Sequence, residues 1–221
     1  MKNNWFKDYK NWEQEYSSKG DYHFRLKGFE KWWFNRNYEM LCYNLKPNRK
    51  VLDLGCGDGV LSNYYRSSRL IGNDISDEGL KLARDTGKYR ELYKHDISDF
   101  MISSGTFDYV LSSLTLQYLS RDQFVSCVKS VHNELKPGGG FIFSYPNLNK
   151  TNNNDIIQIL LENGFSIGNV NGICFRIPKV LFNLSFIPFL RIFSYLYFLF
   201  SLSAKYAPYK SYHYVIYAEK I

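Results

Sequence analysis

The chain has 221 residues and a mass of 26.1 kDa, with 45% hydrophobic and 22% charged residues. That composition is typical of a globular domain with a core of its own, and it excludes a disordered or fibrous chain. The net charge is +7, with a sequence pI near 9.1.

The positive charge is concentrated at the two ends of the chain. Residues 1–50 hold 11 Lys and Arg against 6 Asp and Glu, and residues 169–221 hold 6 against 1. Residues 51–168, by contrast, hold 11 against 14. This separation predicts that the terminal segments meet an anionic partner, the alternative being charge that serves solubility alone.

The cysteines and the N-terminus indicate where the protein works. The four cysteines are far apart and include no C-x-x-C pair, so neither a zinc cluster nor a disulfide framework is expected. The first 16 residues contain no apolar segment of the kind found in secretory signals. We therefore expect a cytoplasmic protein without a bound metal.

Short apolar runs alternate with segments of helical spacing. A helix is expected over residues 24–45. The expected strands are residues 50–54, 69–74, 91–94, 107–111, 141–144, 165–170 and 212–219. Helices are expected between them at residues 60–65, 78–85 (capped by Asp77), 122–135 (stopped by the turn at 136–139) and 153–163. Strands separated by helices predict an α/β fold with a mostly parallel sheet.

We expect one domain made of four parts. These are an N-terminal helical cap (1–48), a cofactor-binding core (49–170), an aromatic lid insertion (171–211) and a last strand (212–221). Within the insertion, Pro188 and Arg191 interrupt the apolar stretch 180–204, so it is too broken for a bilayer span. It is expected to form two helices over the sheet edge, or alternatively a hairpin at a membrane surface.

A glycine-rich turn follows the first strand, in the sequence Val51-Leu52-Asp53-Leu54-Gly55-Cys56-Gly57-Asp58-Gly59. Such a turn lets a ligand touch the backbone and the start of the next helix. A dinucleotide fingerprint would place its third glycine at position 60, which is Val60. The Asp53 carboxylate would also repel a phosphate, so the turn favours a ligand with positive charge.

Two further acids follow the next two strands. Asp74 lies 19 residues after Gly55, the spacing at which an acid binds a ribose hydroxyl pair. Asp96 follows the third strand, where it can accept a hydrogen bond from an exocyclic amine. The pattern predicts a pocket for a nucleoside that carries an ammonium-like group and no phosphate.

These motifs resemble those of the class I S-adenosylmethionine-dependent methyltransferases over about residues 48–150. The resemblance includes Asp53-Leu54-Gly55-Cys56-Gly57, Asp74, Asp96-Ile97, the run from Phe107 to Tyr118, and Leu135-Lys136-Pro137-Gly138-Gly139. It implies a Rossmann-like seven-stranded sheet with an antiparallel last strand, and S-adenosylmethionine as cofactor with S-adenosylhomocysteine as product. The cofactor contacts it implies are Asp53, Gly55, Cys56, Gly57, Asp74, Ile75, Asp96, Ile97, Ser112, Leu114 and Gln117.

Acceptors in open α/β sheets bind over the carboxyl ends of the strands. The candidate catalytic residues there are Gln117, Tyr118 and Tyr145, with Asn147 close by. The family often has a histidine shortly after strand four, where this chain has Gln117-Tyr118. His23, in the N-terminal segment, is therefore the first candidate for a general base.

The acceptor is expected to be a small anionic molecule. Relatives that methylate nucleobase amines carry a D/N-P-P-Y/F tetrapeptide after strand four, whereas this chain has Ser112-Ser113-Leu114-Thr115, so DNA is disfavoured. Segments 144–147, 160–165 and 172–178 are similar to bacterial methyltransferases of glycans and small molecules. A nucleotide-linked or phosphorylated sugar, methylated on O or N, is the expected acceptor. Two alternatives stay open: a membrane-surface methyltransferase of a lipid or quinone-type acceptor, and a non-catalytic cofactor-binding partner or RNA-binding subunit.

Overall fold

The computed structural model describes residues 16, 28–43, 45–65, 67, 69–146, 150–173, 211 and 213–221. The predicted lid at 180–204, His23 and Asn147 lie outside the described residues. Among the helices of the described part, none is long and apolar enough to cross a membrane.

Seven strands form one sheet in the order β3-β2-β1-β4-β5-β7-β6. Their bounds are β1 Val51–Leu54, β2 Leu70–Asp74, β3 Glu91–Lys94, β4 Phe107–Ser112, β5 Leu135–Pro146, β6 Phe165–Gly172 and β7 His213–Lys220. The first five strands pair in parallel, and β7 pairs antiparallel with both β5 and β6. This confirms the Rossmann-like sheet and its antiparallel last strand.

The antiparallel direction of β7 determines what reaches the functional edge of the sheet. His213, the first residue of β7, pairs with Pro146, the last residue of β5. The start of β7 therefore lies beside the carboxyl ends of the parallel strands. Ligands of open α/β sheets bind at that edge.

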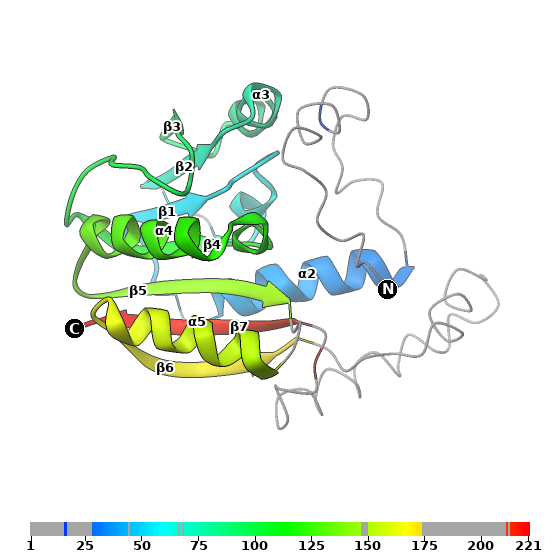
Figure 1. Cartoon of the computed structure of the whole chain (residues 1–221). Helices are drawn as coiled ribbons and strands as arrows, with labels where there is room; N and C mark the ends of the chain where they lie inside the picture. The colour runs from blue at the N-terminus through cyan, green and yellow to red at the C-terminus, as the bar shows by residue number, and fades with distance from the viewer. Residues whose placement is uncertain are drawn as a thin grey trace.

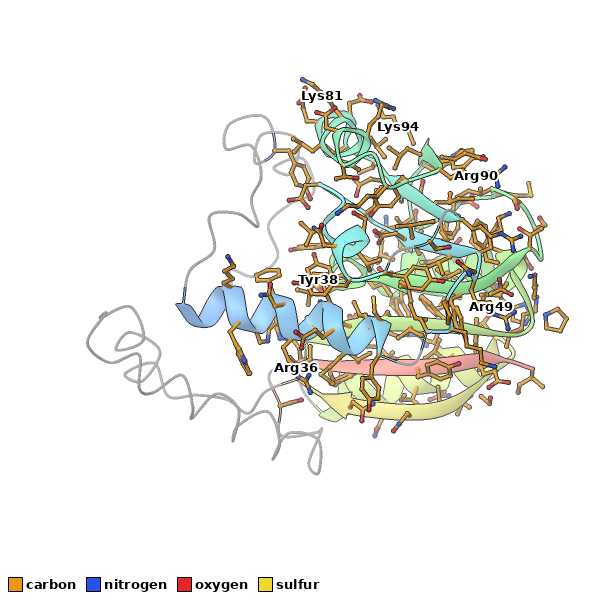
Figure 2. All side chains as sticks on the ribbon, turned by 180° about the vertical axis from the view of Figure 1, so that it is seen from behind. Arg36, Tyr38, Arg49, Lys81, Arg90 and Lys94 are labelled. Atoms are coloured by element: carbon orange, nitrogen blue, oxygen red, sulfur yellow. The ribbon has the colours of Figure 1, made fainter. Side chains whose placement is uncertain are left out.

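Helices cover both faces of the sheet (Figure 1). α4 (Arg121–Glu134) and α5 (Lys150–Glu162) pack on one face, over a core that includes Phe141 and Phe143. α2 (Gly28–Cys42) packs on the other face, where Tyr38 and Leu41 join a second buried cluster (Figure 2). α3 (Asp77–Asp85) packs against β2 and β3.

Two local predictions need correction. The glycine turn leads into a short 3-10 helix, η2 (Val60–Asn63), because Gly59 enters it with a left-handed backbone and without a side-chain cap bond. Ser76, not Asp77, caps α3: its hydroxyl accepts a hydrogen bond from the Gly79 amide at 2.9 Å. Asp77 instead forms a surface ion pair with Lys94 at 2.5 Å.

The predicted turn after α4 lies inside the bounds of β5. The helix ends at Glu134, as the sequence indicated, but pairing to β4 begins at once with Leu135. The partner then jumps from Leu135 to Gly140, so residues 136–139 form an irregularity in the strand. Proline and glycine are tolerated there because they interrupt the ladder at its end rather than in its middle.

Candidate functional site

The glycine turn lies at the carboxyl end of β1 and is tied to the neighbouring strand. The amides of Gly55 and Cys56 both donate to the Asn73 carbonyl of β2, at 2.8 and 3.0 Å. Gly55 has φ +76°, and a Cβ there would lie 2.5 Å from Thr115 Cγ2. A side chain at position 55 is therefore excluded both by the backbone conformation and by the loop that follows β4. Cys56 is buried, and burial raises the pKa of its thiol.

Gly57 is covered by an aromatic residue that the sequence analysis did not identify. Its φ is +51°, and a Cβ there would overlap the hydroxyl oxygen of Tyr16. The Tyr16 ring also lies against Gly79 of α3. Burial, with Asp74 and Asp58 nearby, raises the pKa of Tyr16 well above its usual value. Tyr16 thus stays protonated and presents an O–H group at the glycine turn.

Asp53 is buried beneath the turn rather than exposed at its rim. It is 1% exposed, and Tyr89 donates its hydroxyl to Asp53 Oδ2 at 2.5 Å. Burial raises the Asp53 pKa to about 7, the Tyr89 hydrogen bond opposes this, and the nearby Asp74 and Asp58 add to it. A nearby cation would favour the ionised form. Tyr89 carries no motif, so the sequence offered no signal for this partnership.

Asp74 ends β2 and is held in place by two backbone amides. Gly57 donates to Asp74 Oδ2 at 2.8 Å, and Ser76 donates to Asp74 Oδ1 at 2.9 Å. The two amides fix the orientation of the Asp74 carboxylate. The next residue, Ile75, is an apolar side chain left 37% exposed. A fixed carboxylate beside an exposed aliphatic group suits the hydroxyl pair and the flat base of a nucleoside.

Asp96 follows β3 on an exposed loop. Its Oδ1 accepts from the Ser98 amide at 2.8 Å, and Ile97 is half-buried against the core. The buried Asn73 side chain anchors this loop, because it accepts from the His95 amide at 3.1 Å and donates to the His95 carbonyl at 3.4 Å. The three predicted acids therefore lie on adjacent strands: Asp53 within β1, Asp74 at the end of β2 and Asp96 after β3.

The segment after β4 is shaped by side chains of its neighbours. Ser112 donates to the Leu54 carbonyl of β1 at 2.9 Å and is fully buried. Leu114 has φ +53°, and its amide donates to Ser144 Oγ of β5 at 2.9 Å. Gln117 and Tyr118 follow in the short helix η3 (Leu116–Tyr118), and both are half-buried.

Tyr145, predicted as a catalytic candidate, lies on the sheet face that α4 covers. Its ring packs edge-on against Phe124 of α4, with the ring centroids 6.2 Å apart, and burial raises its pKa. Its antiparallel partner is Tyr214 of β7.

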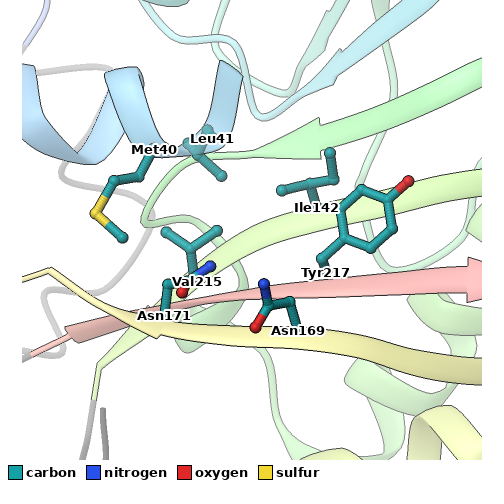
Figure 3. A pocket seen from close by; sticks show the side chains of 7 residues that line it. All are labelled: Met40, Leu41, Ile142, Asn169, Asn171, Val215 and Tyr217. Carbon is teal, nitrogen blue, oxygen red and sulfur yellow. The ribbon is translucent and has the colours of Figure 1, made fainter. Parts of the chain in front are cut away.

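Two pockets lie elsewhere on the described part of the chain. One opens between α2 and the strands β5, β6 and β7 (Figure 3). It is lined by Met40, Leu41, Ile142, Asn169, Asn171, Val215 and Tyr217. The other lies near the amino ends of β4 and β5, where Asp108 accepts from Lys136 at 2.9 Å. The described residues form no cluster of His, Cys, Asp or Glu able to hold a metal ion.

Comparisons with known proteins agree with this geometry. The family "Methyltransferase domain" matches residues 51–139. An uncharacterized methyltransferase of Synechocystis is 32% identical over 111 residues, covering 49% of this chain and 51% of the relative. A carboxy-S-adenosyl-L-methionine synthase of Campylobacter fetus is 34% identical over 113 residues, covering 48% of this chain and 47% of the relative. The chain spans about half the length of the curated relatives it matches.

The fold is also found in solved structures. An S-adenosylmethionine-dependent methyltransferase of Mesorhizobium loti aligns with a TM-score of 0.59 at 17% identity, covering 84% of this chain and 98% of the other. A putative methyltransferase of Listeria monocytogenes aligns with a TM-score of 0.56 at 22% identity, covering 85% and 97%. Residues 51–139 thus match a methyltransferase domain, and the chain shares the fold of S-adenosylmethionine-dependent methyltransferases.

Proposed function

We propose that the protein is a methyltransferase that binds S-adenosylmethionine at the carboxyl edge of β1, β2 and β3 and methylates an O or N atom of a small acceptor. The observation that carries the proposal is Asp74, whose two oxygens are oriented by the Gly57 and Ser76 amides at 2.8 and 2.9 Å. This arrangement pre-organises a carboxylate for a ribose hydroxyl pair at the end of β2.

The other residues of the edge would hold the rest of the nucleoside. Ile75 offers an exposed apolar surface to a base, and Asp96 offers carboxylate oxygens to an exocyclic amine. Tyr16 lies over the glycine turn, where the amino-acid part of the cofactor would lie. The neighbouring acids Asp53 and Asp58 are buried next to this turn and favour a cationic ligand.

When bound, S-adenosylmethionine supplies an electrophilic methyl group on a positively charged sulfur. The chain itself has to hold the acceptor in line with that group, exclude water and let the acceptor lose one proton. Positioning of this kind is worth about 7–11 kcal/mol of the barrier. Because positioning suffices, the absence of a histidine after β4 is compatible with the proposed reaction.

For the acceptor, we favour a small anionic molecule such as a phosphorylated or nucleotide-linked sugar. The support is the positive charge of residues 1–50 and 169–221. The relatives do not favour one class of acceptor, because their names include a malonyl-[acyl-carrier protein] O-methyltransferase, an mRNA cap guanine-N(7) methyltransferase and a ubiquinone biosynthesis O-methyltransferase. A preference for glucose 6-phosphate over glucose as methyl acceptor is the expected direction, and equal turnover of phosphorylated and neutral acceptors would count against it. The cytoplasmic location and the membrane contact through 180–204 stay predictions.

The cofactor site is tested by calorimetry with S-adenosylmethionine and S-adenosylhomocysteine. Asp74→Ala removes the oriented carboxylate and is expected to weaken both affinities by at least about tenfold, or about 1.4 kcal/mol. Asp77→Ala is the matched control, because Asp77 lies three residues away and pairs with Lys94 at the surface. Failure of the wild-type protein to bind either nucleoside, or equal affinities for the two variants, would refute the proposal.

A further inference from the structure

Four buried side-chain atoms have no hydrogen-bond partner among the described residues. One is the donor Arg36 Nε on α2. The other three belong to residues beside the carboxyl edge: Asn37 Oδ1 on α2, Gln117 Oε1 in η3 and His213 Nδ1 at the start of β7. A buried polar atom left unpaired costs about 1–3 kcal/mol, so native structures keep few of them. Three such atoms at a sheet edge where ligands bind indicate a site that is completed by a ligand.

The helix α2 brings two of these atoms to one place. Trp33 and Asn37 are four residues apart and so share one face of the helix, about 6 Å apart along its axis. Trp33 packs against the His213 ring, with centroids 4.6 Å apart. Asn37 Nδ2 donates to Ser113 Oγ at 2.7 Å. One turn of α2 therefore contacts the start of β7 through Trp33 and the segment after β4 through Asn37.

The same place adjoins the proposed cofactor site. Gln117 lies four residues after Ser113, in a helix that packs against β5. Between them, Thr115 contacts Gly55 of the glycine turn, with its hydroxyl 3.5 Å from the Gly55 carbonyl. Gln117, which follows β4, therefore lies beside the turn proposed to hold the methyl donor, whereas His213 starts β7, two strands beyond β4.

Asn37 Oδ1 and Gln117 Oε1 are amide oxygens and accept hydrogen bonds, and His213 Nδ1 accepts in the tautomer that carries its proton on Nε2. Burial lowers the His213 pKa to about 3, so its imidazole is neutral at physiological pH and keeps one ring nitrogen as an acceptor. A hydroxyl or an amine would find acceptors in these three atoms, and the one unpaired donor beside them is Arg36 Nε on α2. The three atoms therefore fit the hydroxyl or amine end of an acceptor.

We propose that Asn37, Gln117 and His213 form the acceptor subsite and bind a small molecule through its hydroxyl or amine hydrogens, with Trp33 fixing the His213 ring. This rests on the proposed methyltransferase function. In this subsite Gln117 lies on the side of the cofactor, and His213 binds and orients the acceptor from the far side.

The binding test uses the protein saturated with S-adenosylhomocysteine and ¹⁵N-labelled at histidine. Glycerol, which has three hydroxyl donors, is the probe, and 1,2-dimethoxyethane, of similar size but without donors, is its control. The His213 ring signals, identified by their loss in His213→Phe, are expected to shift saturably with glycerol and not with 1,2-dimethoxyethane. Unchanged His213 signals, or equal shifts with both probes, would overturn the subsite.

The functional arm measures transfer of a radiolabelled methyl group to the small-molecule fraction of a cell extract. His213→Phe keeps an aromatic ring for Trp33 and removes the nitrogen, so transfer should fall at least about tenfold. Asn37→Leu should show the same loss. The control is His132→Phe, because His132 packs edge-on against Phe165 near the opposite edge of the sheet.

Affinity for S-adenosylhomocysteine separates the two proposals. It should stay within twofold of wild type in all three variants, which also shows that they fold. Full transfer by His213→Phe would overturn the subsite alone. If the wild-type protein did not bind the nucleoside, the proposed function would be overturned. The glycerol experiment, repeated without nucleoside, would still test the subsite.

Discussion

The buried acid beneath the glycine turn makes a sharp prediction about stability and pH. Asp53 is 1% exposed, and burial raises its pKa from 3.8 to about 7. In Asp53→Asn the side chain imitates the protonated acid, and it still offers an oxygen to the Tyr89 hydroxyl. The substitution therefore removes the titration while leaving the packing and this hydrogen bond in place.

The direction and the size of the pH effect on the free energy of unfolding follow from the pKa of Asp53 in the unfolded and in the folded chain. Between pH 3.8 and about 7 the folded protein keeps the Asp53 proton and the unfolded chain has lost it, so the free energy of unfolding falls as pH rises. The fall is about 1.4 kcal/mol per pH unit and stops above pH 7. From pH 5 to pH 8 the wild-type protein should lose about 3 kcal/mol through this one group.

Urea unfolding at pH 5 and pH 8 measures the effect. Asp53→Asn should exceed the wild type by about 1.7 kcal/mol at pH 5 and by about 4.3 kcal/mol at pH 8, a difference of about 3 kcal/mol between the two pH values. Asp85→Asn, an exposed aspartate at the end of α3, should follow the wild type at both pH values. If wild type and Asp53→Asn lost the same free energy between the two pH values, the burial argument for Asp53 would be refuted.

Two further predictions separate the site from the scaffold. Gly57→Ala places a methyl group against Tyr16, so cofactor affinity should fall at least about tenfold by calorimetry, since the turn or Tyr16 must move. Gly87→Ala is its control, because Gly87 also has positive φ (+65°) but has nothing within 4 Å of the added Cβ; equal losses of affinity would contradict crowding as the cause. Glu134→Gln removes one of the two acceptors that hold the amides of residues 102 and 103, at 2.6 and 2.8 Å. It should cost about 1–3 kcal/mol in urea unfolding and leave cofactor affinity unchanged, because Glu134 lies at the amino edge of the sheet; weaker cofactor binding would contradict that separation.

The sequence predicted the site correctly where the backbone conformation, or a position at the end of a strand, requires a particular residue type. Glycines were needed at 55 and 57, and both have positive φ. Asp74 was expected at the end of a strand, and it ends β2. Strand-and-helix alternation predicted the sheet, because each strand buries apolar residues between two helical layers.

The sequence was uninformative where a role depends on contacts across long separations. Tyr89 binds Asp53 over 36 residues, and Asn37 binds Ser113 over 76. Neither Tyr89 nor Asn37 lies in a motif. Hydrophobic periodicity predicts the helix or strand that contains a residue, and it does not predict which distant residue its side chain contacts. The same limit applies to Tyr16, one of 19 tyrosines, since only the folded chain shows which of them lies on Gly57.

His213 shows how topology, rather than local sequence, assigns a residue to a site. The sequence placed it on the last strand, 95 residues beyond Tyr118, with no motif to distinguish it from a core histidine. Because β7 enters the sheet antiparallel, between β5 and β6, its first residue reaches the edge where the parallel strands end. Had β7 been parallel, the same edge would have met Lys220 instead. Helix α2 then matters for chemistry as well as for packing: the helix that buries Leu41 against the sheet also carries Trp33 to the imidazole.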